Sequence, residues 1–212
     1  MNIALIGATG FVGQALLEEL LSRHHTVRAL QRDPAKLAAR PGLEARAVDV
    51  LGSGNLAAEL KGVDAVVSAF NAGWANPNLH DDFLRGSEAI STAAREAGVR
   101  LIVVGGAGSL FINGQQVVDS PDFPADWKQG ALAAREVLTR LRADQSGLDW
   151  TFVSPAFHLE PGARTGVFRL GGEAPVFDAQ GQSRITTADL AVAIVNELEA
   201  PQHRRGRFTL GY

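Results

Sequence analysis

The 212 residues are enough for one large domain, and 46% of them are hydrophobic while 20% are charged. The absence of cysteine excludes disulfides, thiolate nucleophiles, zinc–thiolate sites and cysteine-ligated iron–sulfur clusters; it fits a reducing compartment, and we expect a cytoplasmic protein. A formal net charge of −3 gives no positive field to attract nucleic acid or anionic lipid, so we expect neither as a partner.

Predicted elements alternate along the first three quarters of the chain. Short apolar segments bounded by Gly, Asp or Pro predict strands over residues 3–6, 26–30, 44–48, 65–69, 101–104 and 150–153. Apolar residues at helical spacing predict helices over residues 11–23, 81–97, 127–141 and 188–199. Because the strands are continuously apolar, we expect both of their faces to be buried, as in a Rossmann-type doubly wound parallel α/β sheet. Ligands bind such sheets at the carboxyl ends of the strands.

The chain after Pro155 has a different texture, with glycines that separate short apolar pieces. We expect short strands at residues 167–170 and 175–177 and a closing strand at residues 207–210. We therefore treat residues 1–212 as a single domain in which residues 155–186 form a small C-terminal extension on the substrate side.

Neither long uncharged segment is expected to enter a membrane. Residues 1–17 lack a basic flank and contain three glycines and a glutamine, which is not the pattern of a signal peptide. Residues 101–118 contain four glycines and several amide side chains, which would place unpaired polar groups in lipid.

A glycine motif joins the first predicted strand to the first predicted helix. Gly7, Gly10 and Gly13 have the spacing G-x-x-G-x-x-G. In a dinucleotide-binding loop the first glycine permits the turn, the second admits the pyrophosphate, and the third lets helix and strand pack closely. The start of the helix would add backbone N–H groups and a hydroxyl, from Thr9, Phe11 and Val12. A tight β–α turn that binds nothing is the alternative, which the position of the motif disfavours.

The end of the second strand predicts which dinucleotide is bound. Arg32 can pair with the 2′-phosphate of NADP, so NADP(H) is favoured, while the neighbouring Asp33 keeps NAD(H) as the alternative. After the third strand, Asp49 is placed to meet the adenine amino group, although an exposed loop acid explains it equally well.

Small residues follow the fourth predicted strand. The segment Phe70, Asn71 and Ala72 would let the nicotinamide ribose lie against the backbone, with Asn71 as a polar contact. A plain turn would also use Asn and Gly at these positions.

Beyond these features, the chain resembles the atypical short-chain dehydrogenase/reductase family, in particular NADH-flavin reductase-like proteins and their biliverdin/flavin reductase relatives. The resemblance covers much of the chain and rests on residues 7–13, 31–33, 47–50, 105–110, 123–128 and 154–158. We also expect Val50 and Gly105, which lie in these segments, to contact the cofactor.

The wider family's catalytic Tyr-x-x-x-Lys signature is missing. The one tyrosine is Tyr212, and the lysines are Lys36, Lys61 and Lys128, so the signature cannot be written anywhere in the sequence. Reduction of a simple carbonyl needs an acid to protonate the alkoxide, whereas hydride transfer to a flavin spreads the new charge over the ring system. The departure therefore favours a flavin over an alcohol or ketone.

In the flavin reductase relatives a serine after the fifth strand and a histidine after the sixth lie near the substrate. The resemblance assigns these places to Ser109, which would hydrogen-bond a carbonyl oxygen or the nicotinamide, and to His158, which would donate to or protonate the acceptor. A loop hydroxyl and a surface imidazole are the alternatives. The five histidines are adjacent or scattered, and we expect no metal site.

We thus expect an NAD(P)H-dependent reductase that transfers hydride to a planar conjugated acceptor, above all free flavin as a substrate rather than a prosthetic group. An NADP-binding redox sensor without turnover and a quinone or enone reductase are the alternatives. Its expected partners are small molecules, and the sequence leaves open a monomer or a homodimer.

Overall fold

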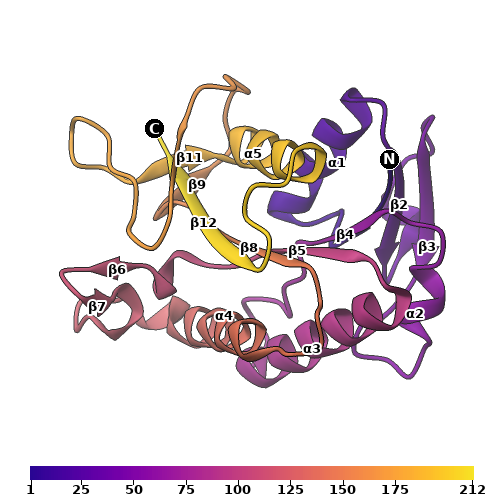
Figure 1. Cartoon of the computed structure of the whole chain (residues 1–212), viewed down its shortest axis with the longest axis horizontal. Helices are drawn as coiled ribbons and strands as arrows, with labels where there is room; N and C mark the ends of the chain where they lie inside the picture. The colour runs from indigo at the N-terminus through magenta and orange to yellow at the C-terminus, as the bar shows by residue number, and fades with distance from the viewer.

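A sheet of eight strands runs through the computed structural model, which describes residues 1–212 (Figure 1). The strand order is β10-β12-β8-β5-β4-β1-β2-β3, and every neighbouring pair is parallel except β10 with β12. The strands are β1 (Asn2–Ile6), β2 (Thr26–Gln31), β3 (Leu43–Ala47), β4 (Ala65–Ser68), β5 (Arg100–Val104), β8 (Trp150–Ser154), β10 (Arg169–Gly171) and β12 (Gly206–Gly211).

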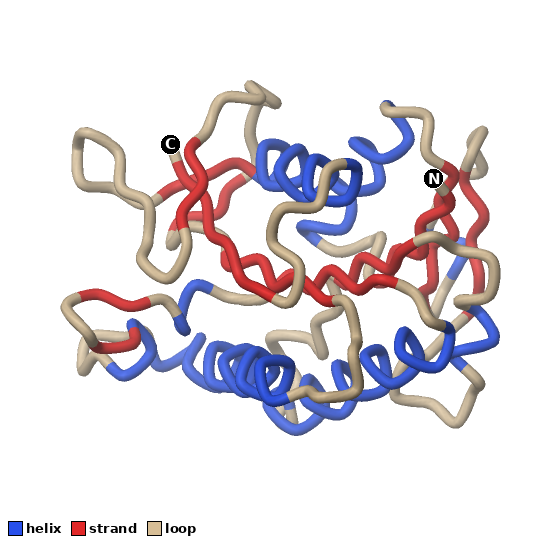
Figure 2. Tube along the Cα trace, in the orientation of Figure 1, coloured by secondary structure: helices blue, strands red, loops and turns tan.

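Helices cover both faces of the sheet, as Figure 2 shows. One face carries α1 (Phe11–Ser22) and α5 (Thr187–Glu199), and the other carries α2 (Leu56–Glu59), α3 (Leu79–Ala97) and α4 (Ala125–Ala143). Alternate residues of each central strand enter two separate cores, so that Ile3 packs with α1 and α5 while its neighbour Ala4 packs with α3 and α4. The predicted doubly wound Rossmann-type fold is therefore confirmed.

Short elements extend from the carboxyl edge of the sheet. The hairpin of β6 (Phe111–Ile112) and β7 (Gln115–Gln116) lies on the α4 side, and the parallel pair of β9 (His158–Glu160) and β11 (Arg184–Thr186) lies on the α5 side (Figure 1). Three single turns of 3₁₀ helix complete the chain: η1 (Pro34–Lys36), η2 (Ala107–Ser109) and η3 (Val117–Asp119).

The helix ends follow from local chemistry. Thr186 caps α5, because its hydroxyl accepts a hydrogen bond of 3.1 Å from the backbone N–H of Asp189. Gly98 ends α3 in a left-handed conformation with φ of 67°. None of the five α-helices combines the length and hydrophobicity that crossing a bilayer requires.

Three predicted strands differ from the structure. β3 pairs only with β2 at the sheet edge and has mostly exposed side chains, so it is not buried on both faces. The strand expected at residues 167–170 begins at Arg169 instead, because Val167 donates to the Thr165 hydroxyl in a local turn. Residues 175–177 form no strand; Pro175 has no N–H to give to a ladder, and it is buried in the loop.

None of the short elements changes the order of the main sheet. The consequence for the site is that the loops after β1, β2, β4, β5 and β8 all emerge at one edge, because these strands are parallel neighbours.

Candidate cofactor and active site

The glycine loop is held by contacts that leave no room for side chains. Gly7 has φ of 85°, and a β-carbon there would lie 2.5 Å from the carbonyl oxygen of Ala69. A β-carbon on Gly13 would lie 1.9 Å from the carbonyl oxygen of Gly7. The loop, the first turn of α1 and the end of β4 are therefore in direct backbone contact.

The first turn of α1 presents unpaired donors to solvent. Gly10 forms the N-cap without a side-chain hydrogen bond, and the first helical N–H with a partner is that of Gln14, which donates to Gly10 O over 3.0 Å. The N–H groups of Phe11, Val12 and Gly13 thus have no acceptor within the protein. Gly10 and Phe11 are exposed, and the first turn contains no acid. These features fit a pyrophosphate.

Thr9 is half-buried at the mouth of this loop. Its carbonyl oxygen accepts a 3.3 Å hydrogen bond from Gln14 Nε2, which ties the loop to the second turn of the helix. The structure shows no hydrogen bond of the Thr9 hydroxyl, so its predicted contact with the cofactor stays a prediction.

At the end of β2, the two residues predicted to select between NADP(H) and NAD(H), Arg32 and Asp33, differ in whether their side chains already have hydrogen-bond partners. Asp33 caps η1 by accepting a hydrogen bond of 3.2 Å from Ala35 N–H, so one carboxylate oxygen is already used. Arg32 is exposed and forms no ion pair or hydrogen bond within the protein. The amide of Gln31 donates to the Asp33 carbonyl over 2.9 Å, while its buried Oε1 has no donor.

The acidic and amide residues after β3 and β4 stabilise their own turns. Asp49 Oδ1 accepts from Leu51 N–H over 3.0 Å, and Asn71 Oδ1 accepts from Gly73 N–H over 2.7 Å. Both side chains are exposed, so each retains free polar atoms at the carboxyl edge. The turn considered for Asn71 and the exposed loop position considered for Asp49 are thus both present.

The remaining residues predicted to contact the cofactor are partly buried against the hydrophobic core. The ring of Phe70 stacks on Phe83 of α3 with 5.9 Å between ring centroids, so its backbone rather than its ring faces the loops. Val50 and Ala72 are half-buried and pack against the same core. A β-carbon on Gly105 would lie 1.9 Å from the ring of Phe152, which explains why glycine follows β5 there.

Ser109 occupies a buried position after β5. It ends η2, and only 2% of its surface is exposed. Its Oγ accepts a hydrogen bond of 2.9 Å from Nη1 of Arg207 on β12. The other side of the Arg207 guanidinium pairs with Glu173. Burial lowers the pKa of Arg207 from its ordinary value, and Glu173 opposes this effect.

His158 has the opposite environment. It begins β9, where its backbone N–H donates to Ser183 O over 3.0 Å, but its exposed imidazole has no hydrogen-bond partner. β5 and β8 are adjacent and parallel, so Ser109 and His158 follow strands that end at the same edge. The structure does not join the two side chains, and it contains no serine–histidine pair for nucleophilic catalysis.

A group of hydrogen bonds around Asp189, here called the polar clasp, holds the loop of residues 161–168 against α5. Asp189 of α5 accepts hydrogen bonds from Thr165 N–H at 2.9 Å, Gly166 N–H at 2.7 Å and the Tyr212 hydroxyl at 2.7 Å. Burial raises the pKa of Asp189, but these hydrogen bonds outweigh it and the net pKa lies below the ordinary value. The chain's one tyrosine is therefore part of this clasp.

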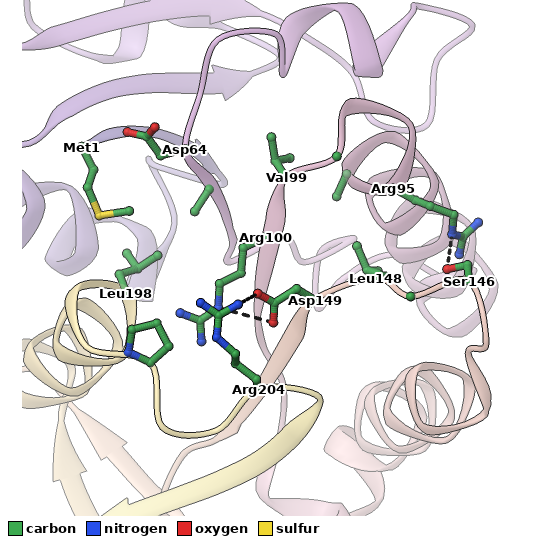
Figure 3. Close-up of a pocket in the computed structure, with 15 residues that line it drawn as sticks. Met1, Asp64, Arg95, Val99, Arg100, Ser146, Leu148, Asp149, Leu198 and Arg204 are labelled. Atoms are coloured by element: carbon green, nitrogen blue, oxygen red, sulfur yellow. Dashed lines mark hydrogen bonds and ion pairs between the residues drawn. The ribbon is translucent and has the colours of Figure 1, made fainter.

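A cavity of about 420 Å³ lies at the other edge of the sheet, as Figure 3 shows. Its lining comes from the amino ends of β4, β5 and β8, and includes Asp64, Arg100 and Asp149. Arg100 lies 2.5 Å from Glu197. Asp149 pairs with Arg204 and also lies 3.9 Å from Nε of Arg100 (Figure 3). No predicted site residue lines this cavity.

Sequence reasoning missed three residues that organise the carboxyl edge, namely Glu173, Asp189 and Arg207. A charged residue within an apolar strand or helix was the available signal for Asp189 and Arg207. Glu173 lies in a loop and gives no such signal; only the fold shows that it meets Arg207.

Residues 7–201 match the family described as NAD(P)H-binding, so the chain belongs to this NAD(P)H-binding oxidoreductase family. It is similar to the uncharacterized protein YwnB of Bacillus subtilis, with 37% identity over 216 residues that cover 99% of this chain and 98% of that protein. The resemblance to atypical short-chain dehydrogenase/reductases is confirmed.

Two solved structures share the whole fold. One, from Bacteroides thetaiotaomicron and provisionally named an epimerase, has 40% identity and a TM-score of 0.91 over 100% of this chain and 96% of that one. Another, from Streptococcus pneumoniae and provisionally named an NADH-flavin reductase, has 35% identity and a TM-score of 0.89 over 100% of this chain and 99% of that one.

Proposed function

We propose that this protein is an NADPH-dependent reductase that transfers hydride to a free flavin at the carboxyl edge of the sheet. The observation that carries the proposal is the first turn of α1, where close glycine packing leaves the N–H groups of Phe11 and Val12 free for a pyrophosphate. Similarity to the Streptococcus pneumoniae protein supports a flavin as the acceptor.

The preference for NADPH rests on the end of β2. Arg32 has a free guanidinium, and such a group binds a 2′-phosphate through charge-assisted hydrogen bonds. Asp33 already caps η1, so it is less available to bind the 2′-hydroxyl of NADH. We therefore propose NADPH as the better donor and NADH as the weaker one.

Bound nicotinamide supplies the hydride, and the chain supplies position and polarity. Ser109 would donate a hydrogen bond to the acceptor, and the free imidazole of His158 would donate to it or protonate it. A tyrosine acid is not part of the proposal, because the Tyr212 hydroxyl is bound to Asp189. The flavin enters and leaves as a substrate, so the partners proposed are small molecules.

A second candidate function is a redox sensor that binds NADPH without turnover. The observation in its favour is the burial of Ser109, whose hydroxyl already has a partner in Arg207. Reduction of a quinone or enone is a variant of the first proposal, since it shares the hydride chemistry and differs in the acceptor.

The test is NADPH oxidation by the purified protein with FMN, FAD, riboflavin or a simple quinone, followed by the loss of reduced-nicotinamide absorbance. NADH replaces NADPH in a parallel series, and a protein-free control corrects for the slow direct reaction. Saturable turnover that depends on the acceptor supports the reductase and ranks the acceptors. Tight NADPH binding without turnover across all acceptors would instead support the sensor.

A further inference from the structure

Arg207 is a fully buried cation in the second strand from the sheet edge. Its side chain has no exposed surface, and its guanidinium lies between two polar groups. Nη1 donates to Ser109 Oγ over 2.9 Å, while Nε lies 3.3 Å from Oε1 of Glu173. Glu173 is itself half-exposed and also pairs with Arg142. A buried charge is costly, so its contact with a predicted site residue calls for an explanation.

The contact fixes the direction of the Ser109 hydroxyl. A guanidinium has only donors, so Ser109 Oγ must accept from Arg207 and keeps its own proton for another group. Arg207 is the one hydrogen-bond partner of Ser109 Oγ in the structure, and the serine proton has no acceptor within the protein.

Two more hydroxyl groups, one on β8 and one on β12, have no hydrogen-bond partner in the protein. Ser154 at the end of β8 and Thr209 on β12 are opposite each other in the strand register, and each is fully buried. Neither side-chain oxygen has a partner. Thr209 is two residues from Arg207 and thus on the same face of the sheet. The carboxyl end of β8 and the adjoining part of β12 therefore hold more polar groups than the protein itself satisfies.

We propose that Arg207 is a positioning residue for acceptor reduction, which holds Ser109 so that the serine hydroxyl donates a hydrogen bond to a carbonyl oxygen or ring nitrogen of the bound acceptor. The inference rests on the proposed reductase function. It defines the acceptor class: a planar molecule whose oxygen or nitrogen becomes electron-rich when hydride is added, such as a flavin or a quinone.

The charge of Arg207 suits this reaction. Hydride transfer moves one proton and two electrons together, so the nicotinamide becomes cationic and the flavin gains one negative charge spread over its ring nitrogen and carbonyl oxygen. Ser109 keeps its proton throughout and only donates a hydrogen bond. A cation directly behind the serine makes that hydroxyl a stronger donor to the negative product than to the neutral substrate, which lowers the barrier.

The test compares Arg207→Met, Arg207→Lys, Ser109→Ala and the double variant Ser109→Ala/Arg207→Met. Arg142→Met is the matched control, because it removes the other arginine of Glu173 without touching Ser109. For each variant we would measure kcat and KM for FMN with NADPH, the Kd of NADPH by protein fluorescence, and the melting temperature.

We expect Arg207→Met to lower kcat about tenfold to hundredfold, with KM and the Kd of NADPH changed less than about threefold. Arg207→Lys should retain more activity than Arg207→Met, and in the Ser109→Ala background Arg207→Met should have little further effect on kcat. Arg142→Met should leave kcat unchanged.

Independent effects of the two substitutions on kcat, or a loss explained wholly by a lower melting temperature, would overturn the inference and leave the reductase in place. Absence of turnover by the unmodified protein with every acceptor would overturn the proposed function and this inference with it. The two failures are therefore distinguishable in one set of measurements.

Discussion

The carbonyl oxygen of Gly7 packs so closely against Gly13 that a β-carbon on Gly13 would lie 1.9 Å from it. The same oxygen would be 3.2 Å from a β-carbon on Gly10. Two glycines of the motif are thus required for different reasons: Gly13 is needed for packing, whereas Gly10 leaves the approach to the helix open.

This difference predicts opposite phenotypes for two alanine substitutions. Gly13→Ala should lower the free energy of unfolding by about 3 kcal/mol or more, because backbone must move to admit the methyl group. Gly10→Ala should cost less than about 1 kcal/mol and weaken NADPH binding about tenfold or more. Chemical denaturation and NADPH titration measure the two effects. A stable Gly13→Ala protein would contradict the packing account.

Replacing Arg32 tests the choice of dinucleotide. Arg32→Asp should weaken NADPH binding about tenfold to hundredfold and change NADH binding by less than about threefold, because only NADPH carries a 2′-phosphate. Lys61→Asp makes the same change of charge at the other edge of the sheet and should alter neither Kd. Equal losses for both dinucleotides in Arg32→Asp would remove Arg32 from the phosphate site.

The Asp189 clasp gives a prediction about stability and pH. Asp189→Asn should cost about 1–3 kcal/mol, since the carboxylate accepts from Thr165, Gly166 and Tyr212. The pKa of Asp189 lies below its ordinary value of 3.8, so this stabilisation is complete above that pH and is lost as the pH falls through the lower folded pKa.

Denaturation of the unmodified protein and of Asp189→Asn at a series of pH values measures the difference between their free energies of unfolding. This difference should be constant near neutrality and shrink at acid pH. Hydrogen exchange should show faster opening of residues 161–168 in Asp189→Asn. Glu160→Gln changes an exposed acid next to the same loop and serves as the control. If the difference in free energy of unfolding grew as the pH fell, the ionised Asp189 carboxylate would not be the stabilising group.

A buried ion pair at the amino edge gives a further prediction. Glu197 lies 2.5 Å from Arg100, and both side chains are buried. Glu197→Gln should destabilise the fold by about 3–5 kcal/mol, because it leaves the buried Arg100 charge with only the more distant Asp149 carboxylate, 3.9 Å from its Nε. Glu199→Gln, two residues further along the same helix and half-exposed, should cost less than about 1 kcal/mol. Thermal unfolding of the two variants would show whether the burial of the ion pair determines how much stability is lost.

Much of the fold could be predicted because its signals are local. Continuous apolar strands and the glycine motif depend on residues close in sequence, and they gave the central strands within one or two residues. β3 was wrongly predicted to be buried on both faces although Glu44 and Arg46 interrupt its apolar residues; at the edge of the sheet these two side chains are exposed and form an ion pair.

The site shows the same division. The free N–H groups of Phe11 and Val12 follow from the position of a glycine motif, which a sequence displays. The contact of Ser109 with Arg207 joins residues 98 positions apart, and no spacing rule predicts it. The turn considered as the alternative for Asn71 is present, and the sequence could indicate it because an Asx turn is formed by neighbours in the chain.

The place of β12 in the sheet also has a consequence for how the chain folds as it is made. β12 lies between β8 and β10, yet it is synthesised after every other strand. Until then the edge of β8 is open, and the pocket in the core that Phe208 later fills is unoccupied. A nascent chain stalled before residue 206 would thus offer an unpaired parallel edge to other chains, and we expect such chains to aggregate or to need a chaperone.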